Sequence, residues 1–216
     1  MLTSPSGFVP MIDVSFIQGD IDWTLVKNYG VQVAAVEIGV GNDQANPLRA
    51  AQVLGALGAG LTVFPYDFCF ALPPDGVHIN RDPVSQAKLF LQEMQNLKLE
   101  GRPIALDFEF PRQQDMQKWK DSDNYVSSWR AACLAEVEQL TGVTPWVYGS
   151  PDYLEVTKCA DDLELTKYPL WIAHYGVASP TIPHPWMDFA AWQYTDKGVV
   201  PGVQTLVDLS WYRPGS

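Results

Sequence analysis

Strand-like runs alternate with helix-like runs along the first two thirds of the chain, and this alternation limits the possible folds more than any other feature. Short apolar runs predict strands at 8–14, 33–38, 61–70, 104–110 and 146–148. Amphipathic runs between them predict helices at 22–29, 48–57, 84–97 and 124–140, and a short helix is predicted to start at 150. Three more strands are predicted at 170–175, 189–194 and 206–211, joined by loops rich in Pro and Gly that leave no room for full helices.

Helix boundaries carry the residues that helix ends prefer. Asp22, Asn46 followed by Pro47, and Asp82 followed by Pro83 predict helix starts. Alternating strands and helices imply a parallel sheet, and eight strands in 216 residues predict an α/β fold, a modified TIM-type barrel whose last part has lost its helices. A doubly wound open sheet is the alternative. No linker, repeat or low-complexity run is present, so we expect a single domain over residues 1–216.

The predicted strand 104–110 has one apolar face and one acidic face. Side chains alternate along a strand, so Asp107 and Glu109 share a face with Ala105. The other face holds Ile104, Leu106, Phe108 and Phe110. Cα atoms two residues apart in a strand are separated by roughly 6.5–7 Å, so each carboxyl can change the other's pKa and both can reach one substrate bond. An edge strand with a solvated polar face is the alternative to an acid/base pair.

Further acids are predicted near the same end of the barrel. Asp13 ends the first strand, and Asp208 lies on the eighth, which closes beside the first. Aromatic residues gather at the same strand ends: Tyr66, Phe68, Tyr148, Trp171, Tyr175, Trp192 and Tyr194. Barrels of this class carry catalytic groups at the carboxyl ends of their strands. Carboxylates ringed by aromatic side chains indicate a site that holds and cleaves sugars, because sugar faces stack on rings while acids transfer protons.

Charge and composition exclude several classes of function. A formal charge of −11 and a pI near 4.5 oppose attraction to nucleic acid or to an anionic membrane, and no apolar run reaches the roughly 20 residues that cross a bilayer. Cys69, Cys133 and Cys159 are interpreted as buried or incidental thiols, because their number and spacing fit neither a disulfide framework nor a zinc site. Dispersed histidines predict no metal site, and nucleotide-binding and common hydrolase motifs are absent.

Four stretches of the sequence resemble glycoside hydrolase family 25, the Chalaropsis-type lysozymes that include many phage endolysins. The opening Asp13-Val-Ser-Phe-Ile-Gln-Gly-Asp-Ile-Asp-Trp is similar to the family's Asp-x-Ser…Gln-Gly-x-Ile-Asp-Trp. The later stretches follow in the family's order: Leu106-Asp-Phe-Glu109, Trp171-Ile-Ala-His-Tyr175, and Trp192-Gln-Tyr with Gly198-Val-Val-Pro-Gly and Val207-Asp-Leu. Together they span nearly the whole chain.

The resemblance implies a flattened (β/α)5(β)3 barrel that hydrolyses the β-1,4 bond between N-acetylmuramic acid and N-acetylglucosamine in peptidoglycan, without a metal or organic cofactor. Glu109 is the implied general acid, and Asp107 either attacks as a nucleophile or orients the substrate's 2-acetamido group. Asp13 and Asp208 are the implied supporting acids. The residues expected to bind the glycan are Tyr66, Tyr148, Trp171, Tyr175, Trp192 and Glu37.

Two positions depart from the family's usual pattern. Glu37 stands where many members carry a basic residue, and Asp67 replaces the more usual histidine between Tyr66 and Phe68. Both carboxyls are expected to add negative charge near the cleft.

The expected partner is the glycan strand of bacterial peptidoglycan, bound by a monomer. The N-terminus does not match the pattern of a Sec signal peptide, and we expect no separate cell-wall-binding domain beside the barrel. We therefore expect synthesis in the cytoplasm of a phage-infected host and action on the wall after release through a separate membrane pore. Two other functions stay open: a catalytically silent barrel that binds cell-wall glycan, and a glycosidase for another amino-sugar polymer such as chitin.

Overall fold

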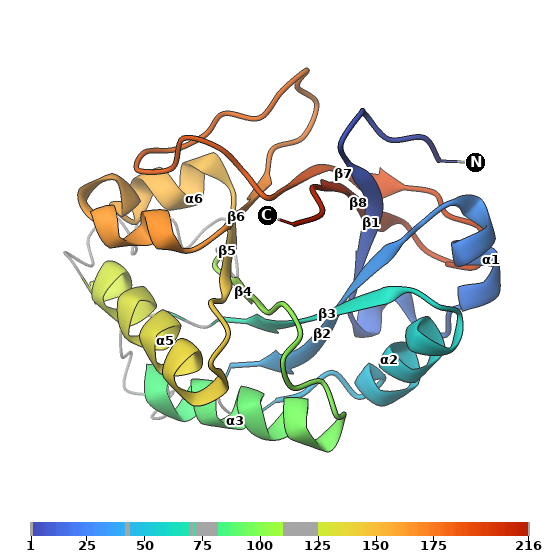
Figure 1. Cartoon of the computed structure of the whole chain (residues 1–216), viewed down its shortest axis with the longest axis horizontal. Coiled ribbons are helices and arrows are strands. Elements are labelled where there is room, and N and C mark those ends of the chain that lie inside the picture. The colour runs from blue at the N-terminus through green and yellow to red at the C-terminus, as the bar shows by residue number, and fades with distance from the viewer. Residues whose placement is uncertain (1, 42–43, 70, 72–81, 110–124, 216) are drawn as a thin grey trace.

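A closed barrel of eight strands forms the centre of the molecule (Figure 1). The structure is a computed structural model and describes residues 2–41, 44–69, 71, 82–109 and 125–215. In chain order, which is also barrel order, the strands are β1 Val9–Val14, β2 Val33–Val40, β3 Thr62–Phe68, β4 Ala105–Asp107, β5 Trp146–Gly149, β6 Leu170–Ala173, β7 Ala191–Gly198 and β8 Val207–Tyr212. The predicted barrel is confirmed, and the open sheet is excluded by this closed order.

Helices cover the outside of the barrel along its first part (Figure 1). Among the described residues they are α1 Trp23–Tyr29, α2 Arg49–Gly58, α3 Pro83–Asn96, α5 Tyr125–Thr141 and α6 Pro151–Val156, with 3-10 turns η1 Phe16–Gln18, η3 Cys159–Asp161 and η4 Leu163–Lys167. Each predicted helix has a counterpart within a few residues. None of the helices in this part of the chain has the length and apolar character to cross a bilayer.

The eighth strand runs against its neighbours. Strands β1 to β7 pair in parallel, whereas β8 is antiparallel to both β7 and β1. The sequence pattern had indicated a parallel sheet. Residues 199–206, between β7 and β8, are too few for the crossover of about a dozen residues that a parallel return needs. The first residues of β8 therefore lie at the end of the barrel where the other strands finish.

Alternation along the strands separates two apolar layers. One layer lies between the barrel and the helices, and it includes Ile12, Val36, Leu106 and Phe108. The other fills the barrel interior, and it includes Met11, Ala35, Phe64 and Trp146. The predicted faces of residues 104–109 are confirmed, and Phe110 lies outside the described residues. Strand β4 is shorter than predicted, so Glu109 follows the strand instead of belonging to it.

The barrel interior is closed by aromatic rings at the end where β1 to β7 begin. Phe64 packs edge-on against Trp146 and Tyr212, with ring centroids 5.4 and 5.2 Å away. Trp146 and Tyr212 are 5.6 Å apart. We call this set of three rings the aromatic plug. Because the plug fills the closed end, a site can form in the barrel only at the opposite end.

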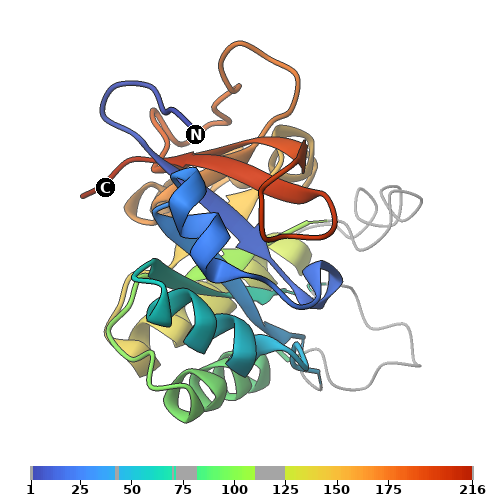
Figure 2. The same cartoon turned by 90° about the vertical axis from the view of Figure 1, so that its right-hand side faces the viewer.

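Both ends of the described chain leave the barrel on the side of the aromatic plug. The Leu2 backbone N–H donates to the carbonyl of Tyr29, the last residue of α1, at 2.8 Å. Near the other end, the Arg213 N–H donates to the carbonyl of Ala190, just before β7, at 2.9 Å. Figure 2 shows both termini on the same side of the molecule.

The start of α2 differs from the prediction. Asn46 and Pro47 were expected to cap and begin this helix, but the helix begins at Arg49. The Asn46 side chain accepts from the Leu48 N–H at 2.9 Å, and it donates to the Glu37 carbonyl oxygen at 3.0 Å and to Gln52 at 2.9 Å. Asn46 thus anchors the β2 backbone at Glu37 to the loop before α2.

Candidate active site

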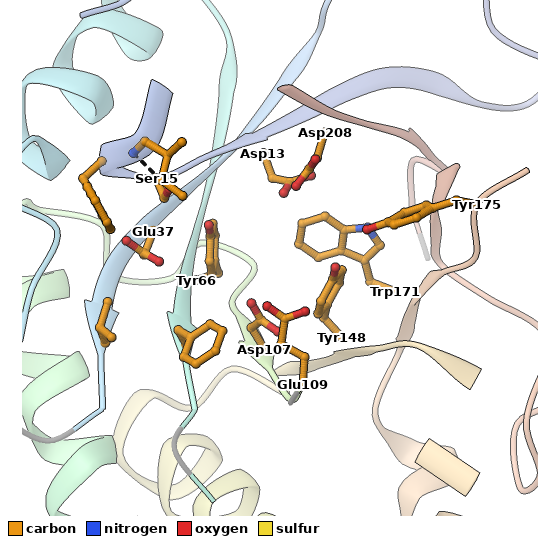
Figure 3. Close-up of a pocket in the computed structure, with 14 residues that line it drawn as sticks. Asp13, Ser15, Glu37, Tyr66, Asp107, Glu109, Tyr148, Trp171, Tyr175 and Asp208 are labelled. Atoms are coloured by element: carbon orange, nitrogen blue, oxygen red, sulfur yellow. Dashed lines mark hydrogen bonds between the residues drawn. The ribbon is translucent and has the colours of Figure 1, made fainter. Parts of the chain in front are cut away.

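A cleft of about 340 Å³ opens at the carboxyl ends of β1 to β6. Five carboxyl groups line it: Asp13, Glu37, Asp107, Glu109 and Asp208. The aromatic side chains that line it include Phe16 and Phe68, and Figure 3 labels the others, Tyr66, Tyr148, Trp171 and Tyr175. Within the described part of the chain, no lysine, arginine or histidine lines this cleft. The structure therefore brings the four predicted acids together with most of the predicted aromatic residues.

Asp13 and Asp208 face one another because β8 is antiparallel. Asp13 is paired with Asp208 in the β1 to β8 register, and their side chains are hydrogen-bonded. Burial, followed by the charge of Asp208, raises the pKa of Asp13 well above its ordinary value. Burial also raises the pKa of Asp208. One proton shared between these carboxyls would avoid two unpaired charges in the same place.

Gln193 connects this acid pair to the aromatic wall. Its amide nitrogen donates to the two carboxylate oxygens of Asp13 at 3.1 and 3.0 Å. Its amide oxygen accepts from the hydroxyls of Tyr148 and Tyr175 at 2.8 and 2.5 Å. Gln193 is buried, and its bond to Asp13 opposes the rise in the pKa of that carboxyl. Gln193 was not among the predicted site residues, although it lies within the Trp192-Gln-Tyr motif.

Asp107 and Glu109 lie together on the opposite wall of the cleft from Asp13 and Asp208 (Figure 3). Asp107 is 8% exposed, and no described residue forms a hydrogen bond with its Oδ1. Burial, followed by the charge of Glu109, raises the pKa of Asp107 well above its usual range. Burial, followed by the charge of Asp208, raises the pKa of Glu109 to about 7. Glu109 can therefore hold a proton near neutral pH, as a general acid must.

Glu37 adds a fifth carboxyl to the cleft. It is 6% exposed, and its Oε1 has no hydrogen-bond partner in the parts of the chain that the structure describes. Burial, followed by the charge of Glu109, raises the pKa of Glu37 to about 7. In the strand register Glu37 on β2 is paired with Tyr66 on β3, whereas Asp107 on β4 is paired with Phe68, two residues further along β3.

Four of the five aromatic residues predicted to bind glycan line the cleft: Tyr66, Tyr148, Trp171 and Tyr175. Trp192 does not. Its Nε1 donates to the His174 carbonyl at 2.8 Å, and its ring packs against Tyr194 at 6.1 Å, within the layer outside the barrel. Alternation along β7 turns Ala191 and Gln193 inward, so Trp192 points away from the cleft.

Asp67 also points away from the cleft, contrary to the expectation that it adds charge there. Its Oδ2 accepts from the Gln86 side chain on α3 at 2.6 Å. Burial raises the pKa of Asp67 well above its ordinary value, so the neutral acid is favoured. A Cβ atom at Gly39 would lie 2.3 Å from Asp67 Oδ1, so this arrangement requires glycine on β2. Asp67 is part of the packing between β2, β3 and α3.

The arrangement favours proton transfer over metal or thiol chemistry. No group of three or more His, Cys, Asp or Glu residues among those described could hold a metal ion. Cys69, Cys133 and Cys159 are free and buried, as predicted. The cleft instead offers acids with raised pKa values next to rings on which a sugar face can stack.

Comparison with known proteins gives a family match over most of the chain. The family model for glycosyl hydrolases family 25 matches residues 12–203. Lysozyme M1 of Streptomyces globisporus is 27% identical over 94% of this chain and 67% of its own length. The autolytic lysozyme of Clostridium acetobutylicum is 29% identical over 94% of this chain, which spans 56% of that relative. A bacterial lysozyme structure from Streptomyces coelicolor shares the fold, with a TM-score of 0.78 at 23% identity, covering 98% of this chain and 94% of the other.

Proposed function

The chain belongs to glycosyl hydrolases family 25, and on this premise we propose that it is an N-acetylmuramidase. It cleaves the β-1,4 bond between N-acetylmuramic acid and N-acetylglucosamine in bacterial peptidoglycan. The observation that carries the proposal is the pair Asp107 and Glu109, one buried and one half-buried carboxyl at the end of β4 in a cleft walled by aromatic rings. Glycosidases use such pairs of carboxyls on either side of the bond that they break.

Glu109 is the proposed general acid. Its pKa of about 7 leaves it largely protonated below neutral pH, so it can give a proton to the leaving glycosidic oxygen. As the pH rises through that value the acid loses its proton, and the rate falls with it. We therefore expect an acidic to near-neutral optimum.

Asp107 is the proposed partner of Glu109, and we expect net retention of the anomeric configuration. The two carboxyls are only two residues apart, which leaves little room for the water that an inverting enzyme activates on the far face of the sugar. Asp107 either attacks the anomeric carbon directly or orients the 2-acetamido group, whose oxygen then attacks. We favour the second route, because an acid so close to Glu109 along the chain is better placed to hold a neighbouring group.

Two measurements separate these routes. If walls whose muramic acid has lost its N-acetyl group are cleaved as fast as acetylated walls, the route through the acetamido group fails. If NMR of early products shows inverted anomers, both routes fail.

The other cleft residues are proposed to hold the substrate. Asp13 and Asp208, bridged to the tyrosines by Gln193, form a rigid polar wall, and Trp171 and Tyr175 offer ring surfaces to the sugar faces. Trp171 is fixed by its Nε1, which donates to Ser210 Oγ at 3.1 Å.

Digestion of purified bacterial walls tests the function. Loss of turbidity, with mass spectrometry that finds muramic acid at the new reducing ends, supports a muramidase. Intact walls that retain the protein in a pull-down would support a silent binding barrel, and release of sugars from chitin alone would support a different glycosidase. The phage origin and the monomeric state stay predictions.

A further inference from the structure

Glu37 is a cleft acid for which the proposed reaction has no task. Glu109 supplies the proton, Asp107 steers the reacting sugar, and Asp13 and Asp208 share a hydrogen bond with each other. Glu37 is 6% exposed and lines the cleft, but its Oε1 has no such partner among the described residues. A buried carboxylate oxygen without a donor is unfavourable, so this side chain fits a ligand that brings a donor with it.

The surroundings of Glu37 favour a cationic donor. Among the residues that the structure describes, those that line the cleft include five acids and no basic residue, so they attract a positive group and repel a further negative group. A metal ion does not fit, since no three metal-ligating side chains converge among the described residues. Hydrogen bonds between an ammonium and a carboxylate are roughly twice as strong as neutral ones. The ligand group with the best match is a primary ammonium.

The position of Glu37 identifies which sugar would carry this group. Glu37 lies on β2, one strand beyond Tyr66 on β3, whereas the reacting pair follows β4. Figure 3 shows Glu37 on the far side of Tyr66 from Trp171 and Tyr148. A sugar next to Glu37 is therefore a neighbour of the sugar whose bond breaks. In a strand that alternates muramic acid with glucosamine, every neighbour of a muramic acid is a glucosamine.

We propose that Glu37 forms a subsite for a glucosamine unit whose 2-amino group is free and protonated, and this inference rests on the muramidase function proposed above. The protein then prefers peptidoglycan whose glucosamine units lack the N-acetyl group, while the muramic acid keeps its own. An acetylated unit presents a neutral amide to Glu37, which gives a weaker hydrogen bond than an ammonium does and does not favour the ionised carboxylate.

The protonation state of Glu37 supports this subsite. Burial, followed by the negative charge of Glu109, raises the pKa of Glu37, and Tyr66 is the polar side chain beside it on the next strand. A bound ammonium would reverse this, because an opposite charge within about 4–6 Å favours the ionised carboxylate. Glu37 therefore gains its charge when the cationic sugar arrives.

Synthetic tetrasaccharides test the proposal. Two are needed, both alternating N-acetylmuramic acid with glucosamine, one with every glucosamine acetylated and one with free amines. We expect the wild-type kcat/KM to be higher for the free-amine compound. Glu37→Gln, which keeps the shape and removes the charge, should lower the ratio of the two kcat/KM values by about tenfold, equivalent to about 1.4 kcal/mol. The matched control is Glu155→Gln on the exposed surface of α6, which should leave the ratio unchanged.

Two results would overturn the subsite. One is a wild-type ratio at or below one, and the other is a ratio that Glu37→Gln does not change. If neither compound is cleaved, the muramidase proposal fails. The subsite is then tested by calorimetry, which measures the Kd of each compound for the wild type and for Glu37→Gln. Tighter binding of the free-amine compound to the wild type, lost in Glu37→Gln, would support the subsite. A melting curve of Glu37→Gln that matches or exceeds that of the wild type shows that the variant is folded.

Discussion

The two ends of the barrel interior are built from the same strands but with opposite kinds of side chain. Strand β3 places Phe64 in the aromatic plug and Tyr66, two residues later, in the cleft. Strand β4 places Ala105 in the interior layer and Asp107 in the cleft. The plug is closely packed and apolar, whereas the cleft gathers five carboxyls, of which Glu37 and Asp107 have oxygens without a partner among the described residues. Alternation sets the inward face along the whole strand, and the residue type then decides whether an end supplies stability or chemistry.

This comparison predicts opposite outcomes for substitutions at the two ends. At the plug, removing a side chain should lower the free energy of unfolding and leave the chemistry of the folded molecules intact. At the cleft, neutralising an acid should lower activity and maintain or raise stability, because like charges and buried carboxyls oppose folding when ionised. A functional site that carries such strain depends on stability supplied elsewhere in the fold.

Glu109→Gln should have the largest effect on activity. Loss of the general acid removes protonation of the leaving oxygen, so wall lysis should fall by about 10²–10⁴-fold. Turbidity assays at pH 6 measure the loss, and thermal melting should show a midpoint no lower than that of the wild type. Lysis within about tenfold of the wild-type rate would remove Glu109 from the role of acid.

Phe64→Ala should have the largest effect on stability. Truncating this buried ring leaves a cavity between Trp146 and Tyr212 and should cost about 3–5 kcal/mol in the free energy of unfolding. Urea denaturation measures this cost. Specific activity, corrected for the folded fraction at a temperature well below melting, should stay close to wild type. A cost below about 1 kcal/mol would mean that the plug repacks and does not carry the stability assigned to it.

Gln193→Leu and Trp192→Phe form a matched pair on neighbouring residues of β7. Gln193→Leu takes the donor from Asp13 and the acceptor from two tyrosines, so activity should fall by roughly tenfold. The pKa of Asp13 should rise further without this bond, which would move the acidic limb of the pH profile to higher pH. Trp192→Phe should change activity by less than about twofold and leave the limb in place, because Trp192 lies outside the cleft. A larger loss of activity in Trp192→Phe than in Gln193→Leu would contradict the placement of Gln193 inside the cleft and Trp192 outside it.

Among the effects on stability, that of Glu37→Gln should be smaller than that of Phe64→Ala and should appear only at high pH, separately from its effect on the preference for the free amine. The folded-state pKa of Glu37 is about 7, above its ordinary value of 4.5, so the protonated form is favoured in the folded protein. The stabilisation that the Glu37 side chain provides is fully present at pH values below its ordinary pKa, and it is lost as the pH rises through its folded-state pKa. Glutamine cannot ionise, so it should raise the free energy of unfolding at pH 8 by about 1–2 kcal/mol and change it little at pH 4. Equal shifts in melting temperature at both pH values would contradict this linkage.

Much of the site could be predicted because strand alternation is a local property. The apolar side chains at 104, 106 and 108 were enough to place Asp107 and Glu109 on the inner face, and the structure confirms both positions. The same alternation also corrects two predictions, namely that Asp67 adds charge to the cleft and that Trp192 binds glycan there. Inward-facing Tyr66 and Phe68 require Asp67 between them to point outward, and inward-facing Ala191 requires Trp192 to point outward and Gln193 to point inward.

Other features depend on contacts between distant segments. Asp208 reaches Asp13 only because β8 is antiparallel, and the short connection at 199–206 was the available sign of that direction. The hydrogen bonds of Gln193 join β7 to β1 and β5, which no local pattern encodes. The lack of a partner on Glu37 is also visible only once the neighbouring side chains are in place.

The antiparallel strand β8, which brings Asp208 to the cleft, also determines on which side of the molecule a tether can be attached. Because β8 returns toward the aromatic plug, the two ends of the described chain emerge there, one beside Tyr29 and the other beside Ala190. A tether joined at either end would therefore hold the molecule by its base with the cleft facing outward. Immobilised on a bead through either terminus, the protein should present the same open mouth to long glycan strands, and a fused partner at either end would not obstruct it.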